Sequence, residues 1–320
     1  MHRTLLPVVA LLLWAGALDA RLLSTPIPTT TASLGFEYHD DSVRALHLKF
    51  FDHLVEQQVA NIFKLVLRGA YEARQRHQKL EYTHDHPRHE RPVVLDVGMN
   101  SGFYTMLSAS LGARVYAFEP QVFCVGIVRD LIRTKNLHLA PLIEIHNMGL
   151  GTTGVVAVPK RSVCDGHFGT DGIPAVEDVE DLNEETVAIP IVDPQLLLPL
   201  WFRNVTLVKM DTEGAEADIL KHLLPFVEAG RIHHIVVEIM PSQWINRASS
   251  LNAGLRTIKR LAALSKRVIA LTDPRVITGG VPRADTEEIG GPTYEEFDLE
   301  GLIRDRHERG GACNVWFSFV

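Results

Sequence analysis

Short apolar runs alternate with longer amphipathic segments over most of the chain, and this pattern predicts strands that alternate with helices. The predicted strands cover residues 93–97, 113–118, 143–147, 155–158, 187–191, 205–210, 234–239, 267–271 and 314–319. The predicted helices cover residues 103–111, 122–135, 215–229 and 255–265, and a short helix starts at Asp193-Pro194. Strands and helices that alternate at this spacing require a parallel sheet with right-handed crossovers. The pattern therefore predicts an α/β fold with helices on both faces of the sheet.

The chain before residue 92 has a different pattern, with an apolar run near its start. Leu5 to Leu13 and Trp14 are followed by small residues, which is typical of a secretory signal peptide over residues 1–20. The run is shorter than the ~20 apolar residues that a membrane span needs, so a retained membrane anchor is the alternative. We expect residues 21–91 to form a helical extension and a His-rich linker, and residues 92–320 to form the α/β domain.

Within the extension, apolar residues recur at steps of three and four from Ala45 to Leu67, after a helix cap at Asp41-Ser42. This spacing predicts a helix that continues to roughly Gln78, with an interruption near Gly69. We expect its apolar stripe to pack on the α/β domain, and a partner-binding helix is the alternative. The linker histidines are interpreted as solvated, since no cysteine or fixed carboxylate accompanies them; they are His77, His84, His86 and His89.

The strand at residues 93–97 leads into a glycine-rich turn. Asp96 lies at the carboxyl end of the strand, where ligands bind in open α/β sheets. Gly98 and Gly102 have no Cβ, so the backbone can turn sharply and approach a ligand closely. Glu119 ends the next strand, 23 positions after Asp96, which is the usual place for a carboxylate that binds ribose hydroxyls. Together these residues predict a site for a nucleotide-like ligand.

The charge of this turn indicates which ligand it binds. No lysine or arginine occurs between Asp96 and Leu111. Turns that bind pyrophosphate leave the N-terminus of the following helix open to the phosphate, whereas this turn places a carboxylate in front. An acidic turn is suited to a cationic or zwitterionic ligand. We therefore predict S-adenosylmethionine, whose amino group and sulfonium are positive, in preference to a nicotinamide or flavin cofactor.

A third segment, Lys209 to Glu216, reads Lys-Met-Asp-Thr-Glu-Gly-Ala-Glu and follows a buried strand. Together with the motif from Asp96 to Gly102 and the pair Glu119-Pro120, it resembles the signature of the FkbM-type methyltransferases. The resemblance runs from about Pro92 to the C-terminus. It implies a Rossmann-like class I methyltransferase fold, with a seven-stranded, mostly parallel sheet whose last strand is antiparallel. The cofactor-binding residues that follow from the motifs and the resemblance are Asp96, Gly98, Asn100, Gly102, Tyr104, Glu119, Asn147, Met148 and Asp211.

Methyl transfer to a hydroxyl group also requires a base that accepts the proton. The predicted catalytic residues are Asp211, Glu213 and Glu216. Glu238 and His146 are further candidates for the base. In the alternative interpretation, Glu213 and Glu216 cap the helix that starts near Gly214. Strand alternation places Lys209 on the same side as Asp211, so the two side chains are expected to pair.

Composition and charge narrow the possible functions. The formal net charge is −7, and the chain lacks a concentrated Lys/Arg stripe with interleaved aromatic residues, which argues against nucleic-acid binding. A chain of 320 residues can bury the core of one large α/β domain and an extension. Cys124, Cys164 and Cys313 permit one disulfide and one remaining thiol in an oxidising compartment, or three unpaired thiols. The sequon Asn204-Val205-Thr206 is a glycosylation site only if the start of its strand is accessible.

We therefore expect an S-adenosylmethionine-dependent O-methyltransferase of the secretory pathway, located in the endoplasmic reticulum or Golgi lumen or secreted. Its partner is a small-molecule or glycan acceptor, and the family resemblance implies a sugar hydroxyl. We expect no metal. We expect membrane attachment only through a retained N-terminal segment. Two other hypotheses are a secreted, catalytically inactive binding protein on a methyltransferase fold and a nucleotide-dependent oxidoreductase. The intact Asp96, Gly98, Gly102 and Glu119 argue against a decayed binding site.

Overall fold

The computed structural model describes residues 36, 54–80, 91–159, 164, 186–201, 204–244, 250–271, 281–282 and 294–320. The predicted signal peptide, the predicted helix cap at Asp41-Ser42 and the linker histidines His84, His86 and His89 lie outside these residues.

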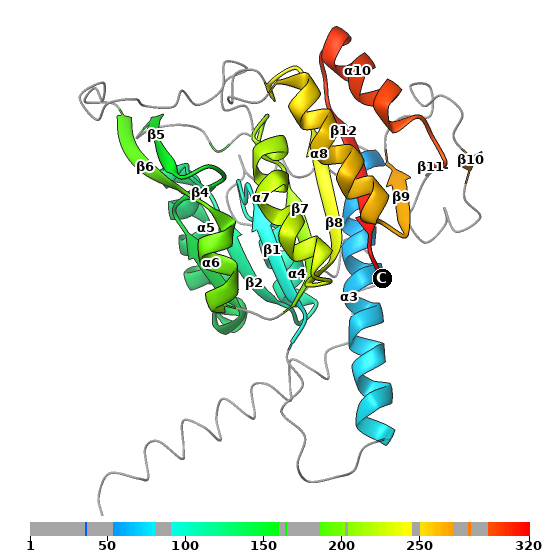
Figure 1. Ribbon diagram of the computed structural model, residues 1–320. Helices are drawn as coiled ribbons and strands as arrows, with labels where there is room; N and C mark the ends of the chain where they lie inside the picture. Colours follow the sequence, from blue (N-terminus) through cyan, green and yellow to red (C-terminus); the bar gives the residue numbers. More distant parts are fainter. Residues whose placement is uncertain are drawn as a thin grey trace, which may run out of the picture.

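A twisted, mostly parallel sheet forms the centre of the protein (Figure 1). Its strands lie in the order β10-β11-β9-β12-β8-β7-β1-β2-β3. The bounds are β1 Val93–Val97, β2 Arg114–Phe118, β3 Ile143–His146, β7 Val205–Met210, β8 Ile232–Ile239, β9 Arg267–Ala270, β10 Val281–Pro282, β11 Tyr294–Glu295 and β12 Cys313–Ser318. β1, β2, β3, β7 and β8 pair in parallel, and β12 pairs antiparallel with β8 and β9. The predicted seven strands with an antiparallel last strand are confirmed, and the two-residue strands β10 and β11 extend the sheet beyond β9.

The remaining strands form a small second sheet that the prediction did not separate from the first. It has the order β4-β6-β5, with bounds β4 Gly149–Leu150, β5 Gly154–Pro159 and β6 Thr186–Val192. β4 directly follows β3, so this sheet starts at the carboxyl end of the large one.

Helices cover both faces of the large sheet (Figure 1). Their bounds are α4 Phe103–Ser110, α5 Val122–Lys135, α6 Pro194–Trp201, α7 Glu216–Glu228, α8 Leu251–Leu264 and α10 Leu299–Arg309, with a 3-10 helix at Leu137–Leu142. α4 and α5 lie on one face, and α7, α8 and α10 lie on the other. The helix α10 was not predicted, because its mostly charged sequence carries few apolar positions: Leu302 and Ile303 are its buried residues.

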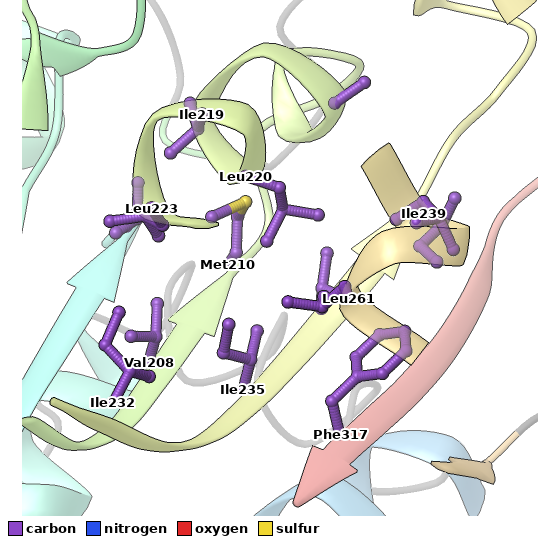
Figure 2. Packing of buried hydrophobic residues seen from close by; sticks show 14 of the residues in the cluster. Val208, Met210, Ile219, Leu220, Leu223, Ile232, Ile235, Ile239, Leu261 and Phe317 are labelled. Carbon is purple, nitrogen blue, oxygen red and sulfur yellow. The ribbon is translucent and has the colours of Figure 1, made fainter. Parts of the chain in front are cut away.

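The larger apolar core lies between the sheet and α7, α8 and α10. Figure 2 shows Val208 and Met210 of β7 and Ile235 of β8 beneath Leu220 of α7 and Leu261 of α8. All five side chains are essentially removed from water. Burial of a large aliphatic side chain contributes roughly 1.5–3 kcal/mol, so these contacts hold the two helices on this face.

The opposite face is covered by α4 and by the N-terminal helix α3 (Leu54–Leu80). Ile62, Phe63 and Leu67 of α3 are buried against this face, so the amphipathic extension packs on the α/β domain. The helix continues through Gly69 without the predicted interruption. None of the helices in the described ranges combines the length and the apolar character needed to cross a membrane.

Strand alternation places the charged side chains of β1 and β7 on this second face. Val94 of β1 and Leu207 of β7 pack toward α3 and α4, and Asp96 and Lys209 each follow two residues later. Asp96 and Lys209 are also register partners across the two parallel strands. The fold therefore brings a carboxylate and an ammonium group together at the carboxyl end of the sheet.

Candidate active site

The turn after β1 joins the loops that follow β2 and β7. The backbone N–H groups of Gly98 and Met99 donate to the carbonyl oxygen of Phe118, at 3.0 and 3.1 Å. Gly98 has a φ of 81°, and a Cβ at this position would collide with the backbone oxygen of Asp211. Glycine is required here both for the left-handed backbone conformation and for the close approach of the β7 loop.

Asp96 is buried beneath this turn. Its Oδ2 accepts a hydrogen bond of 2.6 Å from the hydroxyl of Thr105 on α4, and its buried Oδ1 has no hydrogen-bond partner among the described residues. Burial raises the pKa of Asp96, while the charge of Lys209 and the bond from Thr105 act in the opposite direction. A buried carboxylate oxygen without a partner is costly, so it identifies a place where a ligand that donates a hydrogen bond would be stabilised.

Lys209 lies between the first turn and the loop after β7. Its Nζ is 3.1 Å from Oδ2 of Asp211, donates to the carbonyl oxygen of Gly98 at 3.4 Å, and lies 5.1 Å from the ring centre of Tyr104. The predicted pairing of Lys209 with Asp211 is therefore confirmed. The side chain of Asp211 remains one-third exposed, whereas Lys209 is buried.

Tyr104, a predicted cofactor-binding residue, is buried in the first turn of α4. Its ring packs against Phe63 of α3 and Phe103, with centroid distances of 4.9 and 5.1 Å. Tyr104 thus links the N-terminal helix to Lys209, and its role toward a ligand stays a prediction.

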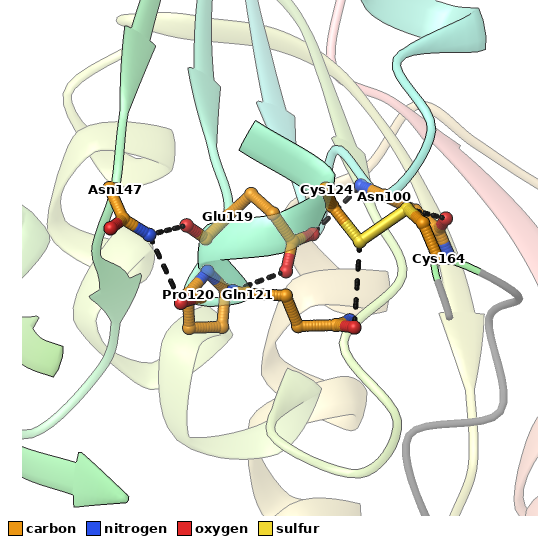
Figure 3. Close-up of a disulfide and its surroundings, with 7 residues drawn as sticks. All are labelled: Asn100, Glu119, Pro120, Gln121, Cys124, Asn147 and Cys164. Atoms are coloured by element: carbon orange, nitrogen blue, oxygen red, sulfur yellow. Dashed lines mark hydrogen bonds between the residues drawn. A yellow bond between two sulfur atoms is a disulfide. The ribbon is translucent and has the colours of Figure 1, made fainter. Parts of the chain in front are cut away.

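Glu119 follows β2 and is almost completely buried, with 2% of its surface exposed. The backbone N–H groups of Asn100 and Gln121 each donate to one of its carboxylate oxygens, both at 2.8 Å (Figure 3). Burial raises the pKa of Glu119 to about 7, against the action of these two hydrogen bonds and of Lys209. The structure therefore fixes this carboxylate beside the first turn, as expected from the 23-residue spacing.

The turn after β7 depends on two residues with positive φ, Glu213 at 51° and Gly214 at 104°. Glu216 begins α7 and is completely buried. Its Oε1 accepts from the N–H of Gly214 at 2.7 Å and from the hydroxyl of Thr212 at 3.2 Å, and its Oε2 accepts from the indole of Trp244 at 3.1 Å. This geometry favours the second of the two interpretations of Glu216, in which the carboxylate stabilises the turn and the helix start.

Glu213 is half-buried at the tip of the same turn. This placement is compatible with both interpretations of Glu213, as a base and as a cap.

The residues after β3 approach Glu119 through the backbone. The side-chain amide of Asn147 donates to the carbonyl oxygens of Glu119 and Pro120, at 2.9 and 3.0 Å (Figure 3). Met148 packs partly buried against the large core. The sequence predicted both as cofactor contacts; the structure places Asn147 behind the Glu119 backbone, where it fixes the loop after β2.

The two further base candidates contact other side chains. His146 stacks on Phe118, with ring centres 5.2 Å apart, and its Nε2 is 3.2 Å from Oε1 of Glu144. Burial lowers the pKa of His146. Glu238 accepts from the side-chain amide of Asn314 at 3.5 Å.

A disulfide joins Cys124 of α5 to Cys164, and Cys313 is a buried free thiol. The structure therefore has the first of the two cysteine arrangements considered from the sequence. Among the described residues, no group of three or more His, Cys, Asp or Glu side chains is placed to hold a metal ion.

Several partners in the site were not predicted. Thr105 bonds Asp96, Gln121 bonds Glu119, and Trp244 bonds Glu216. Trp244 lies 28 residues beyond Glu216, and no spacing rule connects the two. Thr105 lies in the first turn of α4, which follows the glycine-rich turn. A polar residue at this place was the signal from which its bond to Asp96 could have been predicted.

The geometry described so far defines a Rossmann-like α/β protein. Asp96, Gly98, Glu119 and Asp211 lie at the carboxyl edge of its sheet, which we call the ligand edge. The sequence profile of the methyltransferase FkbM domain matches residues 96–261, which is more than half of the chain. The chain belongs to the FkbM methyltransferase family, and the protein is a methyltransferase. A search of curated proteins finds no match.

The solved structures similar to this chain include three methyltransferases of low sequence identity. Precorrin-6y C5,15-methyltransferase from Geobacter metallireducens is 12% identical, with a TM-score of 0.30 over 72% of this chain and 80% of that chain. Human methyltransferase 10 domain containing protein is 11% identical, with a TM-score of 0.31 over 74% of this chain and 76% of that chain. The N-terminal domain of human METTL16, in complex with SAH, is 12% identical, with a TM-score of 0.31 over 74% of this chain and 64% of that chain.

Proposed function

We propose that the protein uses S-adenosylmethionine to methylate a hydroxyl group, and that the acceptor is a sugar or glycan of the secretory pathway. The observation that carries the proposal is the buried Oδ1 of Asp96, which has no hydrogen-bond partner in the described part of the chain and lies beneath the Gly98 turn. An ammonium or hydroxyl group of a ligand would satisfy this oxygen.

The residues of the ligand edge fit such a cofactor. S-adenosylmethionine supplies a methyl group bound to a positively charged sulfur. Gly98 lets the loop after β7 approach the first turn closely, and the carboxylates of Asp96 and Asp211 provide negative charge at this edge of the sheet. Lys209 neutralises part of that charge through its contact with Asp211, so two carboxylates and one ammonium group leave one net negative charge, which a single cation of the ligand would balance.

Glu119 is the residue that we assign to the ribose. Each of its oxygens accepts one backbone hydrogen bond, and a carboxylate has about four acceptor positions. Two positions therefore remain for the two ribose hydroxyls. Hydrogen bonds to a charged group contribute about 1.5–3 kcal/mol each, so Glu119 should supply a substantial part of the binding free energy.

For the transfer itself, the protein has to align the acceptor oxygen and remove its proton. Correct alignment can supply roughly 7–11 kcal/mol of the barrier, and a placed base adds about 10²- to 10⁴-fold. We assign the contact with the acceptor to Asp211, because it is the partly exposed carboxylate at the end of β7 and Lys209 fixes one of its oxygens. Glu213, on the same turn, is the alternative base.

The proposed location rests on two independent features. The N-terminal apolar run has the composition of a signal peptide, and the disulfide between Cys124 and Cys164 is of a kind that persists in oxidising compartments. Glycans are abundant hydroxyl acceptors in these compartments, which supports the acceptor class that the family resemblance implies.

Calorimetric titration with S-adenosylmethionine and with NAD, carried out side by side, tests the cofactor. We expect binding of the first compound and none of the second; the reverse result would contradict the proposal. Incubation with cofactor labelled on its methyl group and fractionated cell-surface glycans then tests the acceptor. Label that is released by glycosidases supports a glycan, whereas label that stays with protein or lipid after this treatment contradicts it.

A further inference from the structure

The disulfide lies directly beside the carboxylate that we assign to the ribose (Figure 3). Its two sulfur atoms contact two residues, Asn100 and Gln121. The same two residues hold the two carboxylate oxygens of Glu119 through their backbone N–H groups. Two residues therefore connect the disulfide to Glu119: Asn100 connects one sulfur atom to one carboxylate oxygen, and Gln121 connects the other sulfur atom to the other oxygen.

On the first side, Sγ of Cys164 lies 3.1 Å from Oδ1 of Asn100, whose N–H donates to Oε2 of Glu119 at 2.8 Å. On the second side, Sγ of Cys124 lies 3.5 Å from Oε1 of Gln121, whose N–H donates to Oε1 of Glu119 at 2.8 Å. A sulfur atom in a disulfide carries no hydrogen, so the amide oxygen and the sulfur form a close polar contact and not a hydrogen bond. The side chains of Asn100 and Gln121 are thus packed against the disulfide while their backbones bind the carboxylate.

This arrangement matters because the backbone of Asn100 is not in a generally favoured conformation. Its φ of 50° lies in the left-handed region, which asparagine tolerates better than most residues but does not prefer. A contact that fixes its side chain also fixes the direction of its N–H group. Cys124, Cys164, Gln121 and Glu119 are all buried, so water cannot readily replace the contacts that hold Asn100 and Gln121.

The disulfide also brings a distant segment to this place. Cys164 is 40 residues from Cys124 along the chain. Without the covalent bond, keeping Cys164 against Asn100 would require this long connection to be ordered by weaker contacts.

We infer that the Cys124–Cys164 disulfide is a positioning element of the cofactor site, which holds Glu119 in place for the ribose through Asn100 and Gln121. The inference rests on the proposed function, because it takes the ribose as the ligand of Glu119. The route from the sulfur atoms to Glu119 runs through Asn100 and Gln121, so we expect the disulfide to affect cofactor affinity and not the chemistry of transfer.

A double-mutant cycle tests this inference against a merely stabilising disulfide. The four proteins are the wild type, Cys124→Ala with Cys164→Ala, Glu119→Gln, and the triple variant that combines them. Cys313→Ser is the matched control, since it removes the other buried cysteine. The measurement is the dissociation constant of S-adenosylhomocysteine by calorimetry, at a temperature well below the unfolding transition of each protein.

We expect the loss of the disulfide to weaken binding by about tenfold, and Glu119→Gln to weaken it by at least as much. The triple variant should bind no more weakly than Glu119→Gln alone, because the disulfide acts through that carboxylate. Losses that multiply in the triple variant, or unchanged affinity without the disulfide, would overturn the inference. Cys313→Ser should bind like the wild type.

A second measurement covers the case in which the cysteine variant does not fold. The folded wild type is treated with a water-soluble phosphine. The phosphine takes the oxygen of one water molecule and becomes phosphine oxide, while the disulfide takes the two hydrogens and becomes two thiols. The affinity of the reduced protein is measured at once. Reduced protein that binds with unchanged affinity contradicts the inference. If Glu119→Gln itself binds normally, the ribose assignment fails; if only the disulfide variants bind normally, the inference fails and the proposed function stands.

Discussion

Nζ of Lys209 lies 3.1 Å from Oδ2 of Asp211, two residues further along the chain, on the face of the sheet that α4 covers. The ammonium group also contacts the Gly98 carbonyl and the Tyr104 ring, and Asp96 is its register partner on β1. A buried cation therefore lies under a turn that we propose binds another cation. Its charge determines how negative the ligand edge is, and so how strongly the charged cofactor is preferred over its neutral product.

The first prediction concerns Lys209→Met. Removing one positive charge makes the edge more negative, which favours S-adenosylmethionine, with its charged sulfur, over S-adenosylhomocysteine. At a separation of several ångströms, one charge in a partly solvated site is worth roughly 1.4 kcal/mol, so the ratio of the two dissociation constants should shift about tenfold toward the cofactor. Competition binding with both compounds measures this ratio. Lys209→Arg, which keeps the charge, should leave it near the wild-type value, and an equal ratio in both variants would rule out the electrostatic role.

The second prediction concerns Asp211→Asn. The substitution preserves the size of the side chain and removes the carboxylate that we assign to the acceptor, so it should lower turnover at least about 100-fold. Cofactor affinity should change much less, since Asp96 and Glu119 remain. Asp130→Asn, an exposed carboxylate on α5, serves as control and should have wild-type turnover. Equal losses in turnover and affinity would instead make Asp211 a cofactor-binding residue.

The sequence predicted the parts of the site that lie at strand ends. Asp96 lies near the carboxyl end of β1, and Glu119 and Asp211 follow β2 and β7. The carboxyl ends of parallel strands share one edge of the sheet, so the proximity of the three residues follows from topology. The pairing of Lys209 with Asp211 follows from alternation along one strand. These predictions needed only local spacing and the order of the elements.

The interactions that the sequence did not predict depend on contacts between distant segments. Glu216, which follows the turn after β7, accepts a hydrogen bond from Trp244, and the disulfide partner of Cys124 is 40 residues away. Local patterns carry no signal for such contacts, because the side chains meet only after the sheet has formed. The helix α10 was missed for a different reason, since its helical character comes from charged residues and an Asp298 cap rather than from an apolar stripe.

The third prediction is a pH dependence of stability caused by Glu119 and Glu216. Burial raises the pKa of each to about 7 in the folded protein, from 4.5 for an exposed glutamate. Between these two values the folded protein binds more protons than the unfolded chain. The contribution of these groups to the free energy of unfolding is therefore largest below about pH 4.5 and decreases as the pH rises toward 7.

Buried histidines change the free energy of unfolding with pH in the opposite direction, so the test compares variants with the wild type. Burial lowers the pKa of His234 to about 4, which stabilises the folded protein as the pH rises. Denaturant unfolding measures the free energy of unfolding at pH 5 and at pH 7.5. The value at pH 7.5 minus the value at pH 5 should be more positive in Glu119→Gln and in Glu216→Gln than in the wild type. Each variant removes one glutamate whose contribution to stability decreases as the pH rises. Arg133→Gln, which lies exposed on α5, should leave the wild-type difference unchanged. Identical differences in all proteins would show that neither glutamate is protonated in this range.

The fourth prediction is that Asn204 carries an N-linked glycan when the chain enters the secretory pathway. Asn204 is exposed and immediately precedes β7, at the amino end of the strand, whereas Asp211 follows the opposite end. The next sequon position, Val205, is buried, and the hydroxyl of Thr206 accepts a hydrogen bond from the N–H of Val93 at 3.3 Å. The asparagine therefore projects from the fold at the edge far from the ligand.

Expression of the full chain in secreting animal cells, with mass measurement before and after glycosidase treatment, checks this prediction. We expect one glycan in the wild type and none in Asn204→Gln. Thr206→Ser is the matched control, because serine keeps both the sequon and the hydroxyl that accepts from Val93. Because the glycan is remote from Asp96 and Asp211, its removal should leave cofactor affinity unchanged. A secreted protein whose mass does not change on treatment would show that Asn204 is not modified, and a chain that stays in the cytosol would contradict the proposed location as well.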